Sequence, residues 1–241
     1  MSNIKRIGDV FCQWPSRPIG LIEIIGGSYI SIKPEITYKR LVTGLLQKNF
    51  AVHSFSYIPN FDHQIQANKA WKQFRSSRNM LEKRIGSIPK TIKLGHSLGC
   101  KLHLLAPDGG RNCNGLVAIS FNNFKADKSI PMLRKMSRRL NFQTEFSPSP
   151  VETFNLIKEH YEQINNLLIR FKNDTLDQNN LLLQSLKERD NDKSKIMQLD
   201  GNHLTPVSTG IREKFLKSNF QSSLKYKTID SIVEQITYWK V

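Results

Sequence analysis

Cysteine is scarce in this sequence, which has Cys12, Cys100 and Cys113 in 241 residues. The number is odd, the positions are widely separated and no Cys-x-x-Cys pair occurs, so we expect neither a disulfide framework nor a zinc site. No two histidines or cysteines have the spacing of metal ligands, and we expect no metal and no cofactor. This cysteine usage is typical of the reducing cytoplasm, which is the compartment that we expect.

Long hydrophobic runs are also missing. The sequence has no run of about 18 apolar residues, and no apolar segment follows the basic residues near the N-terminus, so we expect no transmembrane segment and no secretory signal. The length of 241 residues and the 39% hydrophobic content fit one α/β domain with a substantial core. We therefore expect a single domain over residues 1–241.

Acidic residues are few: 20 Asp and Glu stand against 36 Lys and Arg, a formal net charge of +16. Such an excess suggests polyanionic surroundings, whether nucleic acid, anionic lipid or phosphorylated metabolites. The basic residues are spread along the whole chain, however, and no RNP aromatic signature, KH-type loop or zinc-finger spacing accompanies them. We therefore do not expect a nucleic-acid partner.

Apolar, β-rich runs alternate with stretches of helical periodicity along the chain. The expected strands lie at 20–27, 50–59, 91–94, 115–121, 165–171 and 194–200, and the expected helices at 34–48, 64–84 and after residue 97. This alternation predicts βαβ crossovers and a mostly parallel sheet with helices on both faces. In such sheets ligands bind at the carboxyl ends of the strands, so the loops that follow the strands are the candidate sites.

One of these loops contains the sequence GHSLG, residues 95–99. A Gly-x-Ser-x-Gly pattern forms a nucleophile elbow when a strand leads into it and a helix leads out, because the serine then sits on a sharp turn whose neighbours must be small. The preceding TIKL is β-rich, and the following LGCKLHLLA has helical spacing. The pattern predicts that Ser97 is a nucleophile, with a chance match at a strand–helix junction as the alternative.

A serine nucleophile needs a base that is itself oriented by an acid, in the chain order Ser, Asp or Glu, His. His203 lies in the loop LDGNHLTP directly after the final expected strand, where the base should be. The strand at 165–171 runs into KNDTLDQ, which offers Asp174 and Asp177. Asp174 is the preferred acid because it comes first and fits the turn better. Asp177 remains the alternative acid, although it could instead cap the next helix.

The same chemistry needs an oxyanion hole of backbone N–H groups. One donor is expected from Leu98, the residue after the serine, and another from the early loop IIGGSYI. In that loop Gly26 and Gly27 allow a tight turn, and the N–H of Ser28 or Tyr29 is the candidate second donor. We therefore expect the oxyanion hole around Leu98, Ser28 and Gly27.

The whole chain resembles the α/β-hydrolase superfamily. Within it, the chain is similar to an uncharacterised family of photosynthetic organisms, a domain of unknown function. The resembling stretches are IIGGSYI, IPNFDHQ, KLGHSLGCKLHLL, FSPSPVET, LLIRFKNDTLDQ and LDGNHLTP. The resemblance implies an acyl-transfer fold with Ser97 as nucleophile, His203 as base and an aspartate after the penultimate strand, but it implies no substrate. The His-Gly-Gly-Gly oxyanion motif of lipases is absent, and Gly26-Gly27-Ser28 stands in its place.

Three further side chains are candidates for lining the substrate pocket: Tyr29, His63 and His96. Two of them have an alternative explanation. His96 at a variable position of the elbow could be a packing residue, and His63 follows Asp62, whose position is that of an ordinary helix cap. The sequence leaves both histidines open.

Residues 124–163 fall where this superfamily carries a lid, and we expect a cap insertion there. The segment IPMLRKMSRRLNF would form a helix with one apolar and one basic face. The basic face predicts contact with an anionic substrate or peripheral contact with an anionic membrane, with a solvated helix face as the alternative. The apolar face consists of Met132, Leu133, Met136 and Leu140, and the basic face of Arg134, Lys135, Arg138 and Arg139.

Two classes of function follow from these patterns. The first is a serine hydrolase or acyltransferase that acts on an ester, thioester or lipid acyl group. The second is a non-catalytic protein of the same fold that uses the pocket or the basic surface for binding or assembly, because fold does not dictate activity. The presence of Ser97, an aspartate and His203 in the required order favours the first.

Overall fold

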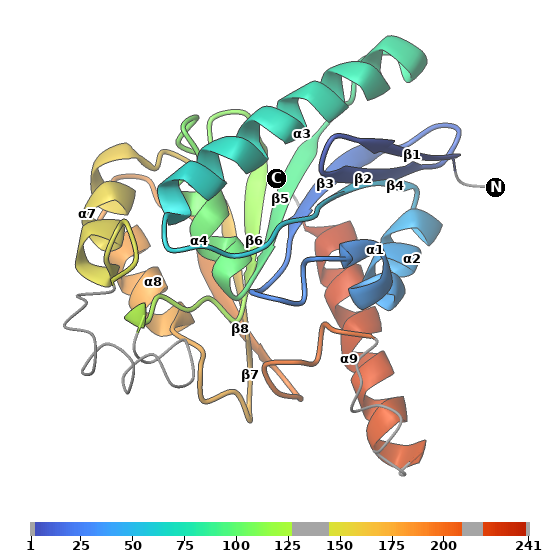
Figure 1. Ribbon diagram of the computed structural model, residues 1–241. Helices are drawn as coiled ribbons and strands as arrows, with labels where there is room; N and C mark the ends of the chain where they lie inside the picture. Colours follow the sequence, from blue (N-terminus) through green and yellow to red (C-terminus); the bar gives the residue numbers. More distant parts are fainter. Residues whose placement is uncertain (1–2, 127–144, 209–218, 240–241) are drawn as a thin grey trace.

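The computed structural model describes residues 3–126, 145–208 and 219–239 of the chain. Within them, eight strands form one sheet in the order β1-β2-β4-β3-β5-β6-β7-β8 (Figure 1). The pairs β1–β2 and β2–β4 are antiparallel, and all other pairs are parallel. The strands are β1 (Asn3–Ile7), β2 (Val10–Trp14), β3 (Gly20–Ile25), β4 (Phe50–Phe55), β5 (Thr91–His96), β6 (Gly115–Ile119), β7 (Asn166–Phe171) and β8 (Lys195–Leu199).

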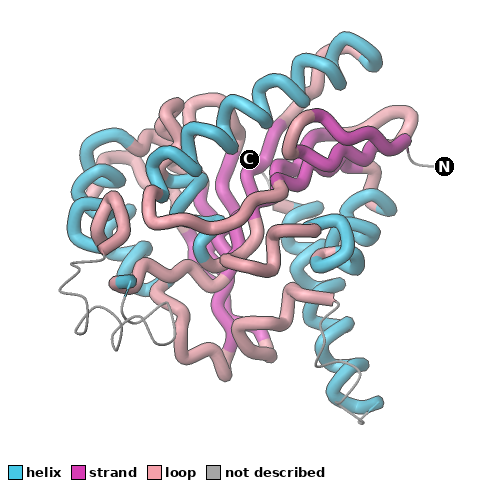
Figure 2. Tube along the Cα trace, viewed as in Figure 1, coloured by secondary structure: helices cyan, strands magenta, loops and turns pink. Residues whose placement is uncertain are grey.

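Helices cover both faces of the sheet, as Figures 1 and 2 show. On one face α2 and α9 pack side by side on the central strands through aliphatic residues that include Leu45 and Ile232. The other face is covered by α3 and α4, and beside them by α7 and α8. The helices are α1 (Pro34–Thr37), α2 (Lys39–Gln47), α3 (His63–Ile85), α4 (Leu98–Leu104), α7 (Pro150–His160), α8 (Asn179–Lys187) and α9 (Asn219–Tyr238).

The central strands are enclosed because both faces are covered. Every residue of β3, β4, β5 and β6 is buried, and most of these residues are apolar, as is typical of strands that helices cover on both faces. Two charged residues inside these strands have a partner of opposite charge. Glu23 of β3 accepts from Arg78 at 2.8 Å, and Lys93 of β5 donates to Asp108 at 2.8 Å.

The predicted fold class, a mostly parallel α/β sheet with helices on both faces, is confirmed, and all six predicted strands are present. The helix expected at 34–48 is instead two helices, α1 and α2, which are separated at Tyr38. Before β3 the chain forms two strands that are not among those six: β2 pairs with the edge strand β1. Within the described residues, no helix is long and apolar enough to cross a membrane.

The expected cap insertion at 124–163 is only partly within the described residues. Its amphipathic segment, with the four basic residues 134, 135, 138 and 139, lies outside them. The later part forms α7, which begins with a capping box between Ser149 and Glu152. Ile157 of α7 is buried in the same apolar cluster as Leu182 of α8 and Leu168 of β7. This part of the segment therefore contributes to the helical layer on the sheet.

Candidate active site

Ser97 occupies a sharp turn between β5 and α4, as the Gly-x-Ser-x-Gly pattern predicts. Its backbone has φ 56° and ψ −123°, a conformation that costs energy for a residue with a side chain. The two glycines allow the turn because backbone fills the space on either side. A Cβ on Gly99 would lie 1.9 Å from the carbonyl oxygen of Ile25, and one on Gly95 would lie 2.5 Å from the Cα of Cys100. Packing around the two glycines thus holds Ser97 in its strained conformation at the carboxyl end of β5.

Three side chains from distant parts of the sequence form a hydrogen-bonded line at this edge of the sheet. His203 Nε2 lies 3.1 Å from Ser97 Oγ, and His203 Nδ1 lies 2.9 Å from Asp174 Oδ2. The side chain of Asp174 is fully buried, and that of His203 is 17% exposed. The neutral tautomer that fits these contacts carries its proton on Nδ1, which donates to Asp174, and leaves Nε2 free to accept from the serine hydroxyl.

The two candidate acids have different contacts. Asp174 contacts His203, and its Oδ1 also accepts from the N–H of Leu176 at 2.9 Å. Burial works to raise the pKa of Asp174, but the hydrogen bonds, first that of His203, outweigh it and lower the pKa below its usual value. Asp177 instead accepts from the N–H of Asn179, the first residue of α8, at 3.3 Å, although the N-cap position of that helix is Gln178.

His96 does not line the cavity, contrary to one of the two roles considered for it, and it has the alternative role of a packing residue. Its side chain is completely buried, and its Nε2 lies 2.9 Å from the carbonyl oxygen of His203 while its Nδ1 lies 2.8 Å from the hydroxyl of Tyr38. Because a carbonyl only accepts, Nε2 of His96 donates and Nδ1 accepts from Tyr38. Burial lowers the pKa of His96 to about 3, so the ring stays neutral. The buried ring of His96 therefore fixes the backbone of the candidate base, His203, through this hydrogen bond.

Gly27 does not fit the role of oxyanion donor that was expected of it. Its N–H donates to the hydroxyl of Tyr38 at 3.0 Å, so it is already engaged and is not a free oxyanion donor. Gly27 instead allows close approach, because a Cβ there would lie 3.1 Å from the Cβ of Ser97. Among the described residues, no hydrogen-bond acceptor is found for the N–H of Ser28, and Leu98 as the first residue of α4 has no intrahelical acceptor. Ser28 and Leu98 thus remain the candidate donors.

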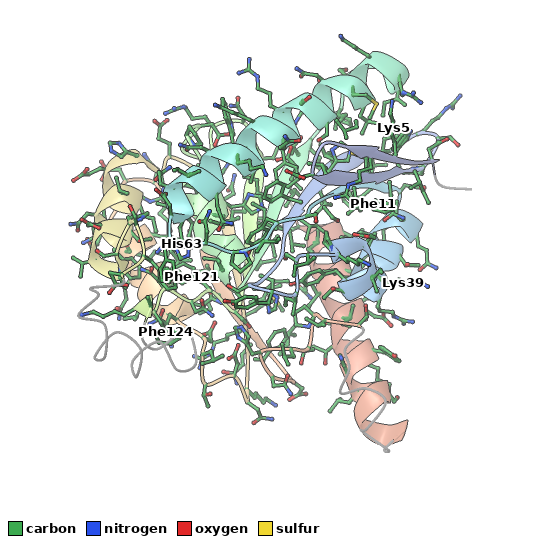
Figure 3. The ribbon with its side chains drawn as sticks, viewed as in Figure 1. Lys5, Phe11, Lys39, His63, Phe121 and Phe124 are labelled. Atoms are coloured by element: carbon green, nitrogen blue, oxygen red, sulfur yellow. The ribbon has the colours of Figure 1, made fainter. Side chains whose placement is uncertain are left out.

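A cavity of about 290 Å³ opens at Ser97, between the loop after β3 and the segments that flank α3 and α7. Of the expected lining residues, Tyr29 and His63 both border it. Figure 3 labels His63 and Phe124, which contribute to the same cavity from different parts of the chain. The ring of His63 packs against Phe146 with the centroids 4.3 Å apart, and burial lowers the pKa of His63 to about 3.

Two polar residues of this cavity were not singled out from the sequence. Asn122, which follows β6, donates from Nδ2 to Ser97 Oγ at 2.9 Å. Lys101 lies one helical turn after Ser97 on α4 and borders the cavity. The rule that sites lie at the carboxyl ends of parallel strands would have drawn attention to Asn122. Helical periodicity from Ser97 would have drawn attention to Lys101.

Solved structures with a similar fold span nearly the whole chain. A monoacylglycerol lipase of Paleococcus ferrophilus has a TM-score of 0.60 at 16% identity, covering 95% of this chain and 98% of its own. A fungal esterase of Rhizomucor miehei has a TM-score of 0.65 at 13% identity, covering 98% and 84%. The fluorophosphonate-binding serine hydrolase F of Staphylococcus aureus has a TM-score of 0.63 at 14% identity, covering 99% and 98%. The fold of this chain is accordingly the α/β-hydrolase fold.

Comparison at the level of sequence gives a narrower result. A search of curated proteins found no match. One family model, described as "Protein of unknown function (DUF1350)", matches residues 3–230, which is nearly the whole chain. The resemblance to a domain-of-unknown-function family within the α/β-hydrolases is therefore confirmed, and the chain belongs to the DUF1350 family.

Proposed function

We propose that this protein is a serine hydrolase that cleaves a small ester or thioester, with Ser97 as nucleophile, His203 as general base and Asp174 as the acid that orients the histidine. The observation that carries the proposal is the continuous hydrogen-bonded line from Ser97 Oγ through both ring nitrogens of His203 to the enclosed carboxylate of Asp174. Such a line is what activation of a serine hydroxyl requires.

The reaction proceeds in two steps. Ser97 Oγ attacks the carbonyl carbon of the substrate while Nε2 of His203 takes the hydroxyl proton, and Asp174 stabilises the imidazolium that forms. The backbone N–H groups of Leu98 and Ser28 hold the negative oxygen of the tetrahedral intermediate. His203 then gives its proton to the leaving alcohol or thiol, and an acyl group remains on Ser97. Water, deprotonated by His203, attacks this acyl-enzyme, and His203 returns the proton to Ser97 Oγ as the bond to the acyl group breaks and the acid is released.

Similar folds support the reaction class. The structures of similar fold include a monoacylglycerol lipase, esterases and a fluorophosphonate-binding serine hydrolase. The cavity of about 290 Å³ lies at the lower end of the range for small-molecule sites, which favours a short substrate group. An acyltransferase would use the same acyl-enzyme with an acceptor other than water.

Labelling with a fluorophosphonate probe tests the proposal. The wild-type protein should be labelled at Ser97, and Ser97→Ala and His203→Ala should abolish labelling and lower ester hydrolysis by several orders of magnitude, about 10⁴-fold or more. Circular dichroism should show that both variants keep the fold. Full labelling of Ser97→Ala would exclude Ser97 as the nucleophile. Absence of labelling and hydrolysis in the folded wild type would favour the non-catalytic alternative, a binding or assembly protein.

A further inference from the structure

Lys101 is a buried lysine in the wall of the cavity at Ser97. Its exposed fraction is 1%, and it lies four residues after Ser97 on α4, so about one helical turn separates the two backbones. Lysine is rarely enclosed unless it is paired with an acid, because an ammonium loses its hydration on burial. The position of Lys101 thus calls for a partner.

The chain provides an internal comparison in a second buried lysine, Lys93. The ammonium of Lys93 donates to both carboxylate oxygens of Asp108, at 2.8 and 3.0 Å. Within the described residues, the ammonium of Lys101 donates one hydrogen bond, to the carbonyl oxygen of Pro148 at 2.9 Å, and lies 5.9 Å from the ring centroid of Phe146, but it forms no ion pair with a carboxylate. Two N–H groups of Lys101 are therefore left without an acceptor there.

The two carboxylates whose charges act on Lys101 already accept hydrogen bonds from backbone N–H groups. Glu145 accepts from the backbone N–H groups of Ala126 and Phe146, at 3.1 and 2.9 Å. Glu152 takes part in the capping box of α7, where it accepts from the N–H of Ser149 at 2.8 Å. Burial lowers the pKa of Lys101 to about 8, and these two carboxylates only partly oppose that effect. Lys101 accordingly keeps its proton at neutral pH.

In the part of the cavity wall that the structure describes, no negatively charged side chain competes for Lys101. Among the described residues that line the cavity none is Asp or Glu, and Lys101 is the one Lys or Arg. His63 contributes a second polar group to the cavity wall that lacks a partner, because its Nδ1 is buried without a hydrogen bond among the described residues. An enclosed ammonium in a wall that lacks carboxylates attracts an anion more strongly than it would in water, because the surrounding protein screens the charge poorly.

Resting on the serine hydrolase proposed above, we infer that the substrate carries an anionic group, a carboxylate or a phosphate, and that Lys101 is a specificity-determining residue that binds this group in the cavity beside Ser97. An anion in the cavity would supply the counter-charge that the described part of the chain provides for Lys93 and not for Lys101. Pairing of a buried ammonium with an anion is worth about 10- to 100-fold in affinity.

Two matched pairs of esters test the inference and locate the anion. The acyl-side pair is 4-nitrophenyl hydrogen glutarate and its neutral methyl ester. The leaving-group pair is 4-acetoxyphenyl phosphate and the neutral 4-methoxyphenyl acetate. The wild type should prefer the anionic member of one pair by at least about 10-fold in kcat/KM, and the pair with the preference identifies the side that carries the charge.

Variants of Lys101 separate recognition from folding. Lys101→Gln replaces the ammonium with a neutral and shorter donor, and it should remove the preference by lowering kcat/KM for the anionic ester far more than for the neutral ester, whereas Lys101→Arg should retain the preference. Lys93→Gln removes an equally buried ammonium outside this cavity and should lower the melting temperature with the preference intact. Raising the pH through about 8 should weaken the wild-type preference, because Lys101 then loses its proton.

A binding measurement keeps the inference separate from the proposed reaction. Calorimetric titration with glutarate and with phenyl phosphate should show binding to the wild type that is at least about 10-fold weaker in Lys101→Gln. Loss of all probe labelling and hydrolysis would overturn the reaction, and the titrations would still decide the role of Lys101. Hydrolysis of neutral esters with no charge preference, together with equal anion binding by wild type and Lys101→Gln, would leave the reaction standing and overturn the role of Lys101.

Discussion

His96 donates a hydrogen bond from Nε2 to the backbone carbonyl of His203 at 2.9 Å. The other ring nitrogen of His96 accepts from Tyr38, whose hydroxyl in turn accepts from the N–H of Gly27. One buried neutral ring thus connects the loop that carries the candidate base with the loop after β3 that carries the candidate oxyanion donor. Both loops border the cavity, so the position of the reacting groups depends on a side chain that does not touch the substrate.

Substitution of His96 should reduce turnover through this connection. His96→Ala removes both hydrogen bonds, and displacement of His203 by about 1 Å would lower kcat by roughly 100-fold with a smaller change in KM. The matched control is His53→Ala on β4, which removes another fully buried histidine, one that pairs with Ser77 at 2.9 Å. That control should lose stability and keep kcat. Equal kcat in the two variants, measured with a neutral ester, would argue against a positioning role for His96.

The two aspartates after β7 should differ in their effect on activity. Asp174→Asn replaces the carboxylate that accepts from Nδ1 of His203, so the wrong tautomer is favoured and kcat should fall by about 10⁴-fold. Asp177→Asn removes a group whose hydrogen bond goes to the start of α8, and it should change kcat by less than about 10-fold. Rates of fluorophosphonate labelling give an independent measure. The reverse ranking would assign the orienting role to Asp177.

Asp177 should also make stability depend on pH. Burial, and then the charge of Asp174, raise the pKa of Asp177 from 3.8 to about 6, and its Oδ1 is buried without a hydrogen-bond partner in the described structure. The folded state therefore binds the proton more tightly than the unfolded state, so the free energy of unfolding should fall as pH rises from about 4 to 6. The loss should be complete above pH 6, at about 3 kcal/mol or less.

Asp177→Asn is the test, because the amide stays neutral at every pH. The variant should be more stable than the wild type above pH 6 and should lack the decline between pH 4 and 6. Urea unfolding at a series of pH values measures the difference. Parallel curves for the two proteins would mean that the carboxyl of Asp177 does not titrate in this range.

Local pattern predicted the parts of this site that a few neighbouring residues determine. The elbow at Ser97 needs glycines because backbone atoms of Ile25 and Cys100 fill the space beside Gly99 and Gly95, and that demand is visible in the sequence. The sequence did not predict whether His96 is buried or faces the cavity, because its burial depends on β3 and β6, which pair with β5 on either side. The contact of Tyr38 with Gly27 was missed for the same reason, since it depends on where α1 ends and α2 begins.

The elbow glycines provide a stability prediction. Gly99→Ala would place a Cβ 1.9 Å from the carbonyl oxygen of Ile25, an overlap with backbone that should cost at least about 3 kcal/mol and abolish activity. Gly86→Ala is the control, because no atom lies within 4 Å of its Cβ position. The backbone of Gly86, with φ 88° and ψ −174°, lies in a region that essentially only glycine adopts, so alanine there carries a strain of about 1 to 3 kcal/mol without any steric overlap, and this variant should stay folded and active. Thermal unfolding and probe labelling measure both effects, and similar melting temperatures for the two variants would contradict the prediction.

Asn122 should fix the direction in which the Ser97 hydroxyl points. Because its amide donates to Ser97 Oγ at 2.9 Å, the lone pair on that side is occupied and the hydroxyl proton is directed to His203. Asn122→Ala should lower kcat by about 10-fold through loss of this orientation.

Asn122→Asp provides the sharper comparison. A carboxylate at this position would accept the hydroxyl proton in place of His203 and repel the negative oxygen of the intermediate, so the loss should exceed that of Asn122→Ala by at least about 10-fold. Acidification should partly restore the activity of Asn122→Asp relative to wild type, since a protonated carboxyl group can again donate to Oγ. Measured pH profiles of the three proteins decide the matter: an Asn122→Asp variant as active as Asn122→Ala at every pH would show that the amide does not orient Ser97.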